Sequence, residues 1–370
     1  MKSKIILLTS EFPPGPGGIG DHSYNLAKWL SILKYPVNVI TDSRKEFYDD
    51  IISFDDNINF IVKRSNRHKG AFFGIFSRIF LYLNAILDSS PNRIFIASGK
   101  FPIWVCGIFS RIFQHKKFIA IVHGSEVNSK RKLNRMYMRW CLNKMDVVIA
   151  VSNYTKHLIK KLDDKKRVVV IPNGFDDFKF KGMRFNKINS NHLRLITVGT
   201  ITTRKGQKNV IKILPKIQKE IPNTTYHIVG MPKEGGEILK LAKNLGVEKN
   251  IDIHGMLNDE EMIKLLKECD IFMMLSQESD LGDVEGFGIA ILEANNLGVP
   301  AIGSKNTGIE DAISDGFSGY LVDPSDKNQI IFCIKKILNN YEEFSKNSKV
   351  WANHFFWSKI IKNYIKHLTF

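Results

Sequence analysis

The chain has 370 residues and a hydrophobic share of 44%, which is enough for two globular domains with buried cores. Its four cysteines are far apart and form no Cys-x-x-Cys pair, which argues against a disulfide framework and against a zinc site, and suits a reducing compartment. No stretch of about 18 uncharged apolar residues occurs, so no transmembrane helix is predicted.

The positive charge is unevenly distributed along the chain. The formal net charge is +17, and residues 1–180 hold 29 basic and 15 acidic side chains, against 25 and 22 in the remainder. A lysine-rich genome would affect both halves alike. The basic first half therefore predicts an anionic partner, which could be a membrane, a nucleic acid or a phosphorylated substrate.

Short apolar runs alternate with helical patterns through the first half. Lys4–Thr9 is too short for a signal peptide and is predicted as a first buried strand. The glycine-rich turn after it contains Gly17 and Gly18, which would allow a ligand to approach the backbone, although a plain loop is the simpler interpretation. A helix is predicted at 21–33. Further strands are predicted at 37–41, 58–62, 93–97, 117–122, 146–151 and 167–171.

Two helical segments of the first half leave alternatives open. Residues 71–87 are apolar on nearly every face, which fits a core helix slightly better than a helix with one face in a membrane interface. Residues 130–139 are strongly basic and could be a solvated face. Because they follow His123 and Gly124, which end a strand where such folds form a cleft, binding of an anionic head group or membrane is the preferred interpretation.

Residues 181–192 have no clear period and are predicted as a linker between domains at 1–180 and 193–350. A second strand–helix series follows, with strands at 193–198, 225–229, 251–253, 271–276, 300–303 and 317–322. Asn258 and Glu261 have the spacing of a helix capping box. The tail, 351–370, carries three consecutive aromatics and predicts a helix that packs back on the first domain. The whole pattern predicts two doubly wound α/β sheets whose carboxyl ends face one cleft.

A cation pair occupies the first strand-end loop of the second half. Arg204 and Lys205 lie between Gly199 and Gly206, and two cations beside backbone N–H groups could clamp a diphosphate. Alone, an ordinary surface Arg-Lys pair would be the better explanation. The glutamates discussed next, in the same domain, favour the clamp.

Glu285 and Glu293 bracket seven residues at the start of a predicted helix. Eight residues of helix rise about 12 Å. That exceeds the roughly 5 to 9.5 Å between the carboxylates of glycosidases, so an acid–base pair is not expected. Instead, Glu285 is predicted in a loop and Glu293 two turns along the helix. N–H groups from Gly286 to Gly288 would face an anion, and the two carboxylates would accept hydrogen bonds from hydroxyls.

These motifs together resemble the retaining glycosyltransferases of family 4, which have the two-domain GT-B fold. The resemblance covers about residues 11–323. Its matching elements are the Glu285-to-Glu293 signature, the Gly17-Gly18 loop, the His123-Gly124 turn, the Pro172-Asn173-Gly174-Phe175-Asp176 stretch, the Gly199-to-Gly206 loop and the Gly298-Val299-Pro300 step.

The resemblance implies how these residues would hold a nucleotide-diphosphate sugar. Arg204 and Lys205 would neutralise the diphosphate, Glu293 would hold ribose hydroxyls, and Glu285 would hold donor-sugar hydroxyls. His123 would contact the donor sugar near the reacting carbon. Gly17 and Gly18 would approach the phosphates from the first domain, and Gly286, Phe287 and Gly288 would contact sugar or phosphate. Residues His254 to Leu257 would lie near the base. Gly199 and Gly230 would also contact the donor.

The resemblance also implies retaining transfer without a metal or other cofactor, because cations and a helix terminus would stabilise the leaving phosphate. The acceptor hydroxyl would attack from the leaving-group face, and the phosphate would take its proton.

The expected partners are a GDP-mannose or UDP-sugar donor, a lipid-linked or cell-surface glycan acceptor and an anionic membrane. The expected location is the inner face of the cell membrane. The alternatives are a GT-B epimerase or a soluble glycan synthase, and more distantly a nucleic-acid-binding protein. The last lacks any recognisable nucleic-acid module.

Overall fold

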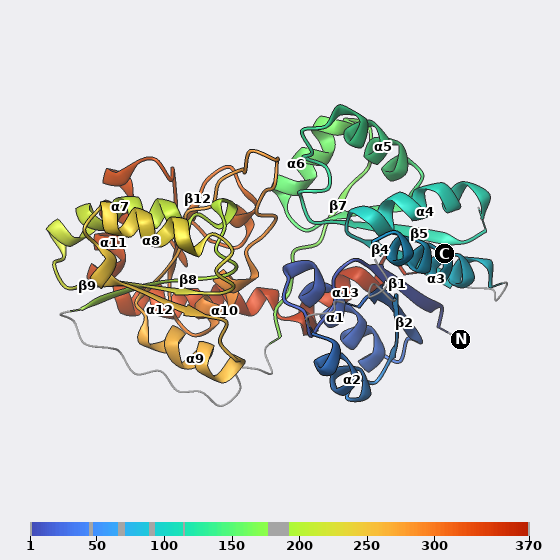
Figure 1. The fold of residues 1–370 in the computed structure, drawn as a ribbon, viewed down its shortest axis with the longest axis horizontal. Helices are drawn as coiled ribbons and strands as arrows, with labels where there is room; N and C mark the ends of the chain where they lie inside the picture. The colour runs from blue at the N-terminus through green and yellow to red at the C-terminus, as the bar shows by residue number, and fades with distance from the viewer. Residues whose placement is uncertain are drawn as a thin grey trace. The chain divides into compact units, whose positions relative to one another are not determined.

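The computed structural model describes residues 2–43, 47–65, 71–88, 93–113, 115–176 and 192–368. The chain forms two compact units, one made of Met1–Phe175 with Trp357–Phe370 and the other of Asp176–Phe356 (Figure 1). The predicted boundary at residue 351 falls inside helix α12 (Tyr341–Ala352), and the chain re-enters the first unit at Trp357. The predicted linker lies outside the described residues except for His192.

Unit 1 is built on a seven-stranded parallel sheet in the order β3-β2-β1-β4-β5-β6-β7. Its strands are β1 (Lys4–Thr9), β2 (Val37–Asp42), β3 (Ile61–Ser65), β4 (Arg93–Ser98), β5 (Lys117–Val122), β6 (Val147–Ala150) and β7 (Val169–Val170). Its helices are α1 (Gly18–Ile32), α2 (Tyr48–Asp56), α3 (Ala71–Leu87), α4 (Lys100–Ile112), α5 (Lys132–Asn143), α6 (Asn153–Leu162) and α13 (Trp357–Ile365). The central strands β1 and β4 are almost entirely buried and mostly apolar, because helices cover both faces of the sheet.

The predicted strand at 58–62 is shifted by three residues. Residues 57–60 form a turn in which Asn57 donates its side-chain N–H to the Ser53 carbonyl (2.8 Å) and closes α2. Strand β3 therefore starts only at Ile61. Its pairing runs from Asn38 opposite Ile61 to Asp42 opposite Ser65.

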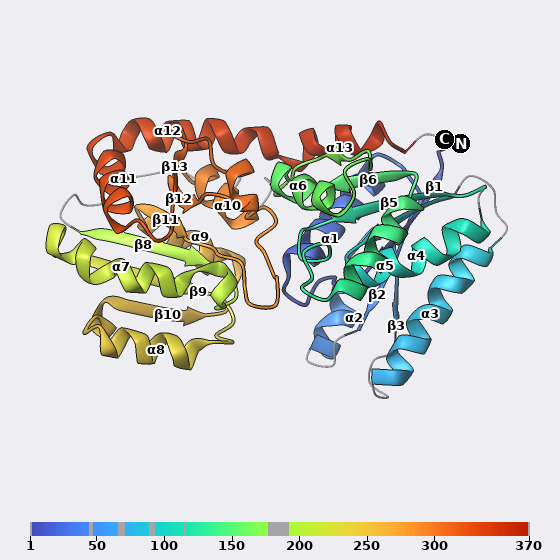
Figure 2. The same cartoon turned by 90° about the horizontal axis from the view of Figure 1, so that it is seen from above.

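Helix α13 packs against α1 within unit 1 (Figure 2). Trp357 and Tyr364 are buried, and the Tyr364 hydroxyl lies 2.8 Å from His22 Nε2. The aromatic residues of the tail therefore pack in both units. Phe355 packs in unit 2 and Trp357 in unit 1.

Helix α3 has one face in the core and another exposed. Arg78 pairs with Asp42 across 2.9 Å and lies 4.1 Å from the Phe101 ring centre, and Tyr82 is fully buried. Among the side chains of α3 that the structure describes, the exposed hydrophobic ones are Ile75, Phe76, Phe80 and Leu87. The helix thus packs on the sheet and also presents apolar side chains to the surroundings. Within the described ranges, no helix is both long and apolar enough to cross a bilayer.

Unit 2 contains a six-stranded parallel sheet in the order β10-β9-β8-β11-β12-β13. Its strands are β8 (Leu193–Val198), β9 (Thr224–Val229), β10 (Ile251–Gly255), β11 (Ile271–Met274), β12 (Ala301–Ser304) and β13 (Gly319–Val322). Its helices are α7 (Gln207–Glu220), α8 (Gly235–Asn244), α9 (Asp259–Glu268), α10 (Ile289–Asn296), α11 (Lys327–Asn339) and α12. The predicted capping box is confirmed, because Asn258 and Glu261 exchange side-chain-to-backbone hydrogen bonds of 2.9 and 3.1 Å.

Candidate active site

The cation pair and the first glutamate of the signature meet in unit 2. Arg204 and Lys205 lie in a short 3-10 helix (Thr203–Lys205) after β8, and Glu285 lies in the loop after β11. Strands β8 and β11 are neighbours in the sheet, so both loops leave the same carboxyl edge side by side. This edge is where open parallel sheets bind ligands.

Glu285 binds both cations through one carboxylate oxygen. Its Oε2 lies 2.9 Å from Lys205 Nζ, and it also accepts a hydrogen bond from the Arg204 guanidinium. The exposed fractions of the side chains are 29% for Arg204, 14% for Lys205 and 10% for Glu285. The cations are therefore held in place yet reachable from solvent. This contact was not predicted from sequence, which assigned Glu285 to sugar hydroxyls.

The ion pairs decide the ionisation of Glu285. Burial alone would raise the pKa of this carboxyl, but the nearby charges of Lys205 and Arg204 outweigh burial and lower the pKa to about 2. Burial lowers the pKa of Lys205, and Glu285 opposes that shift. Glu285 is thus ionised at every physiological pH, and two cations share one anion. The local excess of one positive charge suits a phosphate ligand.

The backbone around Glu285 is fixed by further contacts. The Phe287 N–H donates to the Glu285 carboxylate, and the Gly308 N–H donates to the Glu285 carbonyl (2.9 Å). The Phe287 ring is buried against Phe355, with ring centres 5.8 Å apart. The Phe287 N–H, predicted to face sugar or phosphate, is therefore engaged within the protein in this structure.

The signature helix starts later than its spacing suggested. Gly288 is the N-cap of α10 in the left-handed region (φ 93°), and Gly286 lies in the loop before it. Glu293 is then the fifth residue of α10, just over one turn along the helix, so the predicted two turns are wrong. The helical rise from Glu285 to Glu293 does not apply either, because residues 285–288 are not helical.

Glycines allow three loops at this edge to pack backbone to backbone. A Cβ on Gly230 would lie 2.4 Å from the Gly199 carbonyl oxygen, and one on Gly206 would lie 1.9 Å from the Leu275 carbonyl oxygen. Gly206 has φ 77° and directly follows the cation pair. Gly199 and Gly230, which were predicted as ligand contacts, thus also have a packing role, and so does Gly206.

Replacing Gly206 with alanine should lower the free energy of unfolding by about 2–4 kcal/mol, from positive φ and a backbone clash together. Gly246 is the matched control, because its φ is 68° but a Cβ there would meet nothing within 4 Å. The same change at Gly246 should cost about 1 kcal/mol. Denaturant unfolding of both variants measures the difference, and equal losses would contradict the packing role.

In unit 1, a chain of hydrogen bonds holds His123 at the carboxyl end of β5. Ser98, the last residue of β4, bonds His123 Nε2 across 2.9 Å. Ser23 links the Ser98 hydroxyl (3.4 Å) to the Thr9 hydroxyl (3.1 Å). Burial lowers the pKa of His123 to about 4, so the ring is neutral at pH 7 and does not act there as a cation. Ser98 was missed from sequence because the strand was predicted to end at residue 97.

His22 is a second residue that sequence reasoning missed. It lies on α1, which begins at Gly18 after the N-cap Gly17, and its ring stands 5.1 Å from the His123 ring in an edge-on arrangement. Burial and the neighbouring His123 lower its pKa well below the usual range. Its position one turn after the glycine loop is the signal that could have identified it.

Glu126 is a buried carboxyl in the loop that follows His123. Its Oε2 accepts the His123 N–H (3.1 Å), while Oε1 is buried without a hydrogen-bond partner. Burial raises the pKa of Glu126 to about 7 despite opposing backbone hydrogen bonds. The carboxyl is thus about half protonated at neutral pH and fastens the loop that carries His123.

Glu126→Gln should remove a pH dependence of stability. The unfolded pKa is about 4.3, so the folded wild type binds more protons between pH 4.3 and 7, and its free energy of unfolding falls as the pH rises through that window. Glutamine keeps the acceptor oxygen but does not titrate. The free energy of unfolding of the variant, relative to that of wild type, should increase by about 1–3 kcal/mol as the pH rises from 5 to 8. Urea unfolding at the two pH values measures this gain, and a constant difference would exclude the assignment.

The strand predicted at 251–253 placed His254 in the loop that follows. In the structure, His254 lies within β10, which extends to Gly255. Its Nε2 is 3.1 Å from His227 Nδ1 on the neighbouring strand β9. Its predicted place near a nucleotide base stays a prediction.

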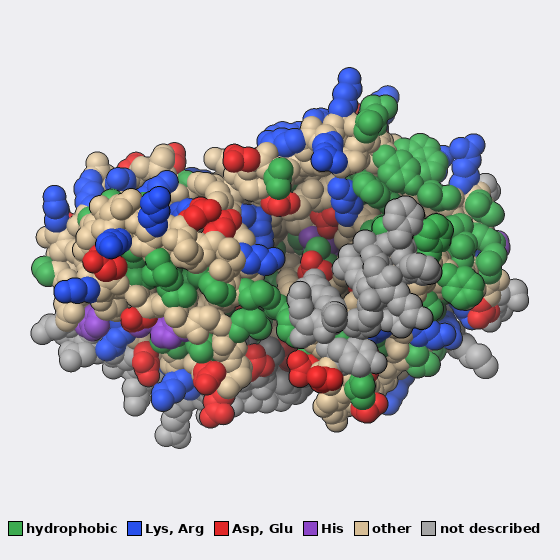
Figure 3. Space-filling model, in the orientation of Figure 1, with side chains coloured by type: hydrophobic (Ala, Val, Ile, Leu, Met, Phe, Trp, Pro, Cys, Tyr) green, Lys and Arg blue, Asp and Glu red, His purple; other side chains and the backbone are tan. Residues whose placement is uncertain are grey.

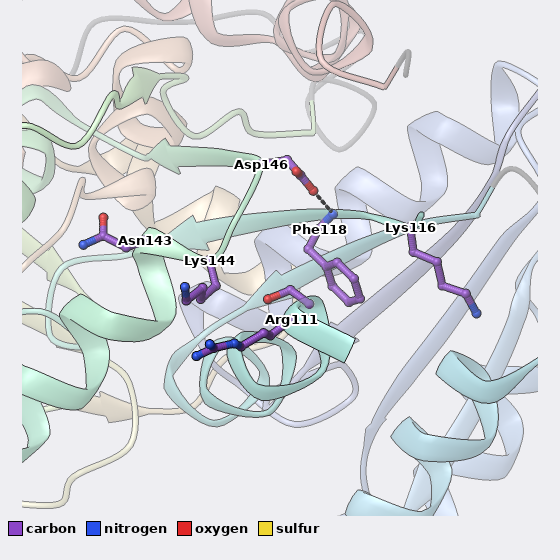
Figure 4. A pocket seen from close by; sticks show the side chains of 7 residues that line it. Arg111, Lys116, Phe118, Asn143, Lys144 and Asp146 are labelled. Carbon is purple, nitrogen blue, oxygen red and sulfur yellow. Dashed lines mark hydrogen bonds between the residues drawn. The ribbon is translucent and has the colours of Figure 1, made fainter. Parts of the chain in front are cut away.

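In unit 1, a pocket of about 300 Å³ lies at the edge of the sheet opposite to the one that carries His123 (Figure 4). Arg111, Lys116 and Lys144 line it beside Asp146, whose carboxylate accepts the Phe118 N–H (2.7 Å). This edge receives the amino ends of β5 and β6 and the carboxyl ends of α4 and α5, where cations complement helix carbonyls. The pocket therefore belongs to the packing of helix ends and not to the site of the signature.

Two family profiles match the chain almost end to end. Glycosyltransferase Family 4 matches residues 16–177, and Glycosyl transferases group 1 matches residues 179–351. The chain belongs to the family-4 glycosyltransferases. It has the GT-B architecture of two parallel-sheet α/β domains, and it is a glycosyltransferase.

Individual relatives are distant. The chain is 28% identical over 247 residues to the GDP-mannose-dependent alpha-(1-6)-phosphatidylinositol monomannoside mannosyltransferase of Mycolicibacterium smegmatis, covering 64% of this chain and 65% of that protein. It is 22% identical to the Mycobacterium tuberculosis protein of the same name, covering 91% and 89%. Its fold is similar to the crystal structure of Anabaena HepE in complex with UDP and glucose, with a TM-score of 0.77, 18% identity and 99% of each chain covered.

Proposed function

We propose that the protein transfers a sugar from a nucleotide-diphosphate sugar to a hydroxyl of a lipid-linked or cell-surface glycan, with retention of configuration and without a metal. The observation that carries this proposal is the Arg204–Lys205 pair, held by Glu285 at the carboxyl edge of the unit 2 sheet. Cations placed in advance at a departing diphosphate act mainly in the transition state, where negative charge develops.

A donor diphosphate would pair with part of the positive charge that Glu285 alone neutralises in this structure. Arg204 and Lys205 would each bind phosphate oxygens, and Glu285 would keep the two side chains in position. Glu293 remains a proposed contact of the ribose, and His123 a proposed contact of the donor sugar. No side-chain nucleophile is required, because the leaving phosphate would accept the proton of the acceptor hydroxyl.

Relatives that act on GDP-mannose and phosphatidylinositol monomannoside support a mannosyl donor and a glycolipid acceptor. The HepE complex with UDP and glucose keeps a UDP-sugar open as the donor. A thermal-shift screen against UDP-, GDP- and ADP-sugars identifies the donor, and repeating it with excess EDTA tests whether donor binding needs a metal. Stabilisation by no nucleotide sugar would contradict the proposal. The anomeric configuration of the product, read by NMR, tests retention.

The acceptor side is proposed to lie against an anionic membrane on the inner face of the cell membrane. Helices α4 and α5 pack together in unit 1, and Ile108, Ile112, Leu133, Met136 and Trp140 are exposed on them. Figure 3 shows hydrophobic side chains gathered over this region with Lys and Arg beside them. Apolar side chains with a basic rim are typical of interfacial binding.

Replacing Lys130, Arg131, Lys132 and Arg135 with glutamine should weaken binding to vesicles that contain anionic lipid. Each basic residue contributes about 1 kcal/mol near such a surface, so a loss of more than 100-fold is expected. The matched control replaces four exposed lysines of unit 2, Lys233, Lys240, Lys243 and Lys249. Flotation with the vesicles measures binding, and equal binding by both variants would contradict this surface.

A further inference from the structure

Three potential metal ligands meet on one face of the unit 2 sheet. His227 lies on β9, and Asp252 and His254 lie on the adjacent edge strand β10. The strand register pairs Asp252 directly with His227. Because side chains two residues apart in a strand point to the same face, His254 projects beside them. The backbone of two paired strands therefore defines the cluster.

The distances between the ligand atoms suit one small cation. His227 Nδ1 lies 3.1 Å from His254 Nε2 and 3.4 Å from Asp252 Oδ2, and all three ligand atoms lie within 4.8 Å of one another. Zinc–nitrogen bonds of about 2.0–2.1 Å in tetrahedral geometry hold ligand atoms about 3.3 Å apart. The side chains would need only small adjustments to enclose an ion.

A second layer of contacts orients the central histidine. His227 Nε2 lies 3.5 Å from the Thr225 hydroxyl, which is 3.0 Å from His192 Nε2. A proton on His227 Nε2 would leave the Nδ1 lone pair facing Asp252 and His254. Metal-bound histidines commonly donate their other N–H to such an oxygen.

From this geometry we propose that His227, Asp252 and His254 form a binding site for a divalent transition metal ion such as Zn²⁺. Two imidazoles and one carboxylate are the ligands that zinc takes, and a fourth position would be filled by water. The Asp252 side chain is 55% exposed, so the ion would enter and leave directly from solvent. Figure 3 shows histidine side chains at the surface of unit 2.

The bound ion would tie the edge strand β10 to β9. It would act as a structural clamp, because the site shares no residue with the Arg204–Lys205–Glu285 cluster. The site includes His254, which is also the predicted contact of the nucleotide base, so its tests measure metal binding and unfolding and not donor binding. Ions that bind the folded chain alone stabilise it by mass action, so unit 2 should unfold at a higher temperature when the metal is present.

Cobalt titration of tag-free, chelator-stripped full-length protein tests the site. Co²⁺ should bind with a stoichiometry of one, give a visible d–d absorption band and be displaced by Zn²⁺. Asp252→Asn/His254→Gln should weaken binding by roughly tenfold or more and abolish the band. His157→Gln, which removes an exposed histidine of unit 1, is the matched control and should bind like wild type.

A second readout keeps the result interpretable. Zn²⁺ should raise the unfolding midpoint of wild type and of His157→Gln but not of the double variant. Without metal, all three proteins should unfold alike, since Asp252 and His254 are exposed. Absence of saturable binding to wild type up to millimolar metal, or equal stoichiometry and affinity in the double variant, would overturn the proposal.

Discussion

Replacing Arg204 or Lys205 with alanine is expected to lower kcat by about 10²- to 10³-fold, which is the usual effect of removing one preplaced donor from a site of developing negative charge. Each variant should remain folded, because Glu285 keeps one of its two cations. The release of nucleoside diphosphate from the donor that the thermal-shift screen identifies provides the assay.

Lys208→Ala is the matched control for both variants. Lys208 is the second residue of α7. Its ammonium pairs with Glu234 (2.7 Å) and Glu237 (2.5 Å), and not with Glu285. Its loss should change kcat by less than about threefold, because surface ion pairs contribute little. Near-normal rates in both Arg204→Ala and Lys205→Ala would remove the diphosphate clamp from the mechanism.

Glu285→Gln should impair both stability and turnover. The substitution leaves two adjacent cations without their shared anion, and breaking a buried pair in this way costs up to about 3–5 kcal/mol. Because Arg204 and Lys205 are 29% and 14% exposed, solvent screens part of that cost. We therefore expect a loss of about 1–3 kcal/mol in the free energy of unfolding. The rate of transfer should fall as the cations leave their positions.

The stability effect of Glu285 should also have a defined pH dependence. The folded pKa is about 2 and the unfolded pKa about 4.3, so ionised Glu285 stabilises the folded state above pH 4.3, and that contribution is lost as the pH falls towards 2. The difference between wild type and Glu285→Gln should be constant from pH 6 to 8 and shrink below pH 4. A difference that persists unchanged at pH 3 would show that the ion pairs do not cause it.

The order of elements was accessible from sequence because it depends on local patterns. Apolar runs located β1, β5 and β8, and Asn258 and Glu261 located the start of α9 by their capping geometry. Strand edges were less accessible. β3 was misplaced because the side chain of Asn57 closes α2 and delays the strand, an interaction that apolar periodicity does not encode.

The candidate site was accessible as a set of residues but not as a set of contacts. The motifs identified Arg204, Lys205 and Glu285. Their contact, however, depends on β8 lying beside β11, and two other strands separate β8 from β11 in the sequence. Glu126 was not identified either. Its carboxyl acquires its role only through burial beside the His123 N–H, and a glutamate four residues after a strand gives no sign of that burial.

The central claim is that Arg204 and Lys205 bind the diphosphate of the donor, and equilibrium binding tests it most directly. Calorimetry would compare the nucleoside diphosphate with its parent nucleoside in wild type and in Arg204→Ala/Lys205→Ala. Hydrogen bonds to charged groups contribute about 1.5–3 kcal/mol each, so the double variant should bind the diphosphate at least 100-fold more weakly and the nucleoside unchanged. An unchanged Kd for the diphosphate, or an equal loss for both ligands, would contradict the claim.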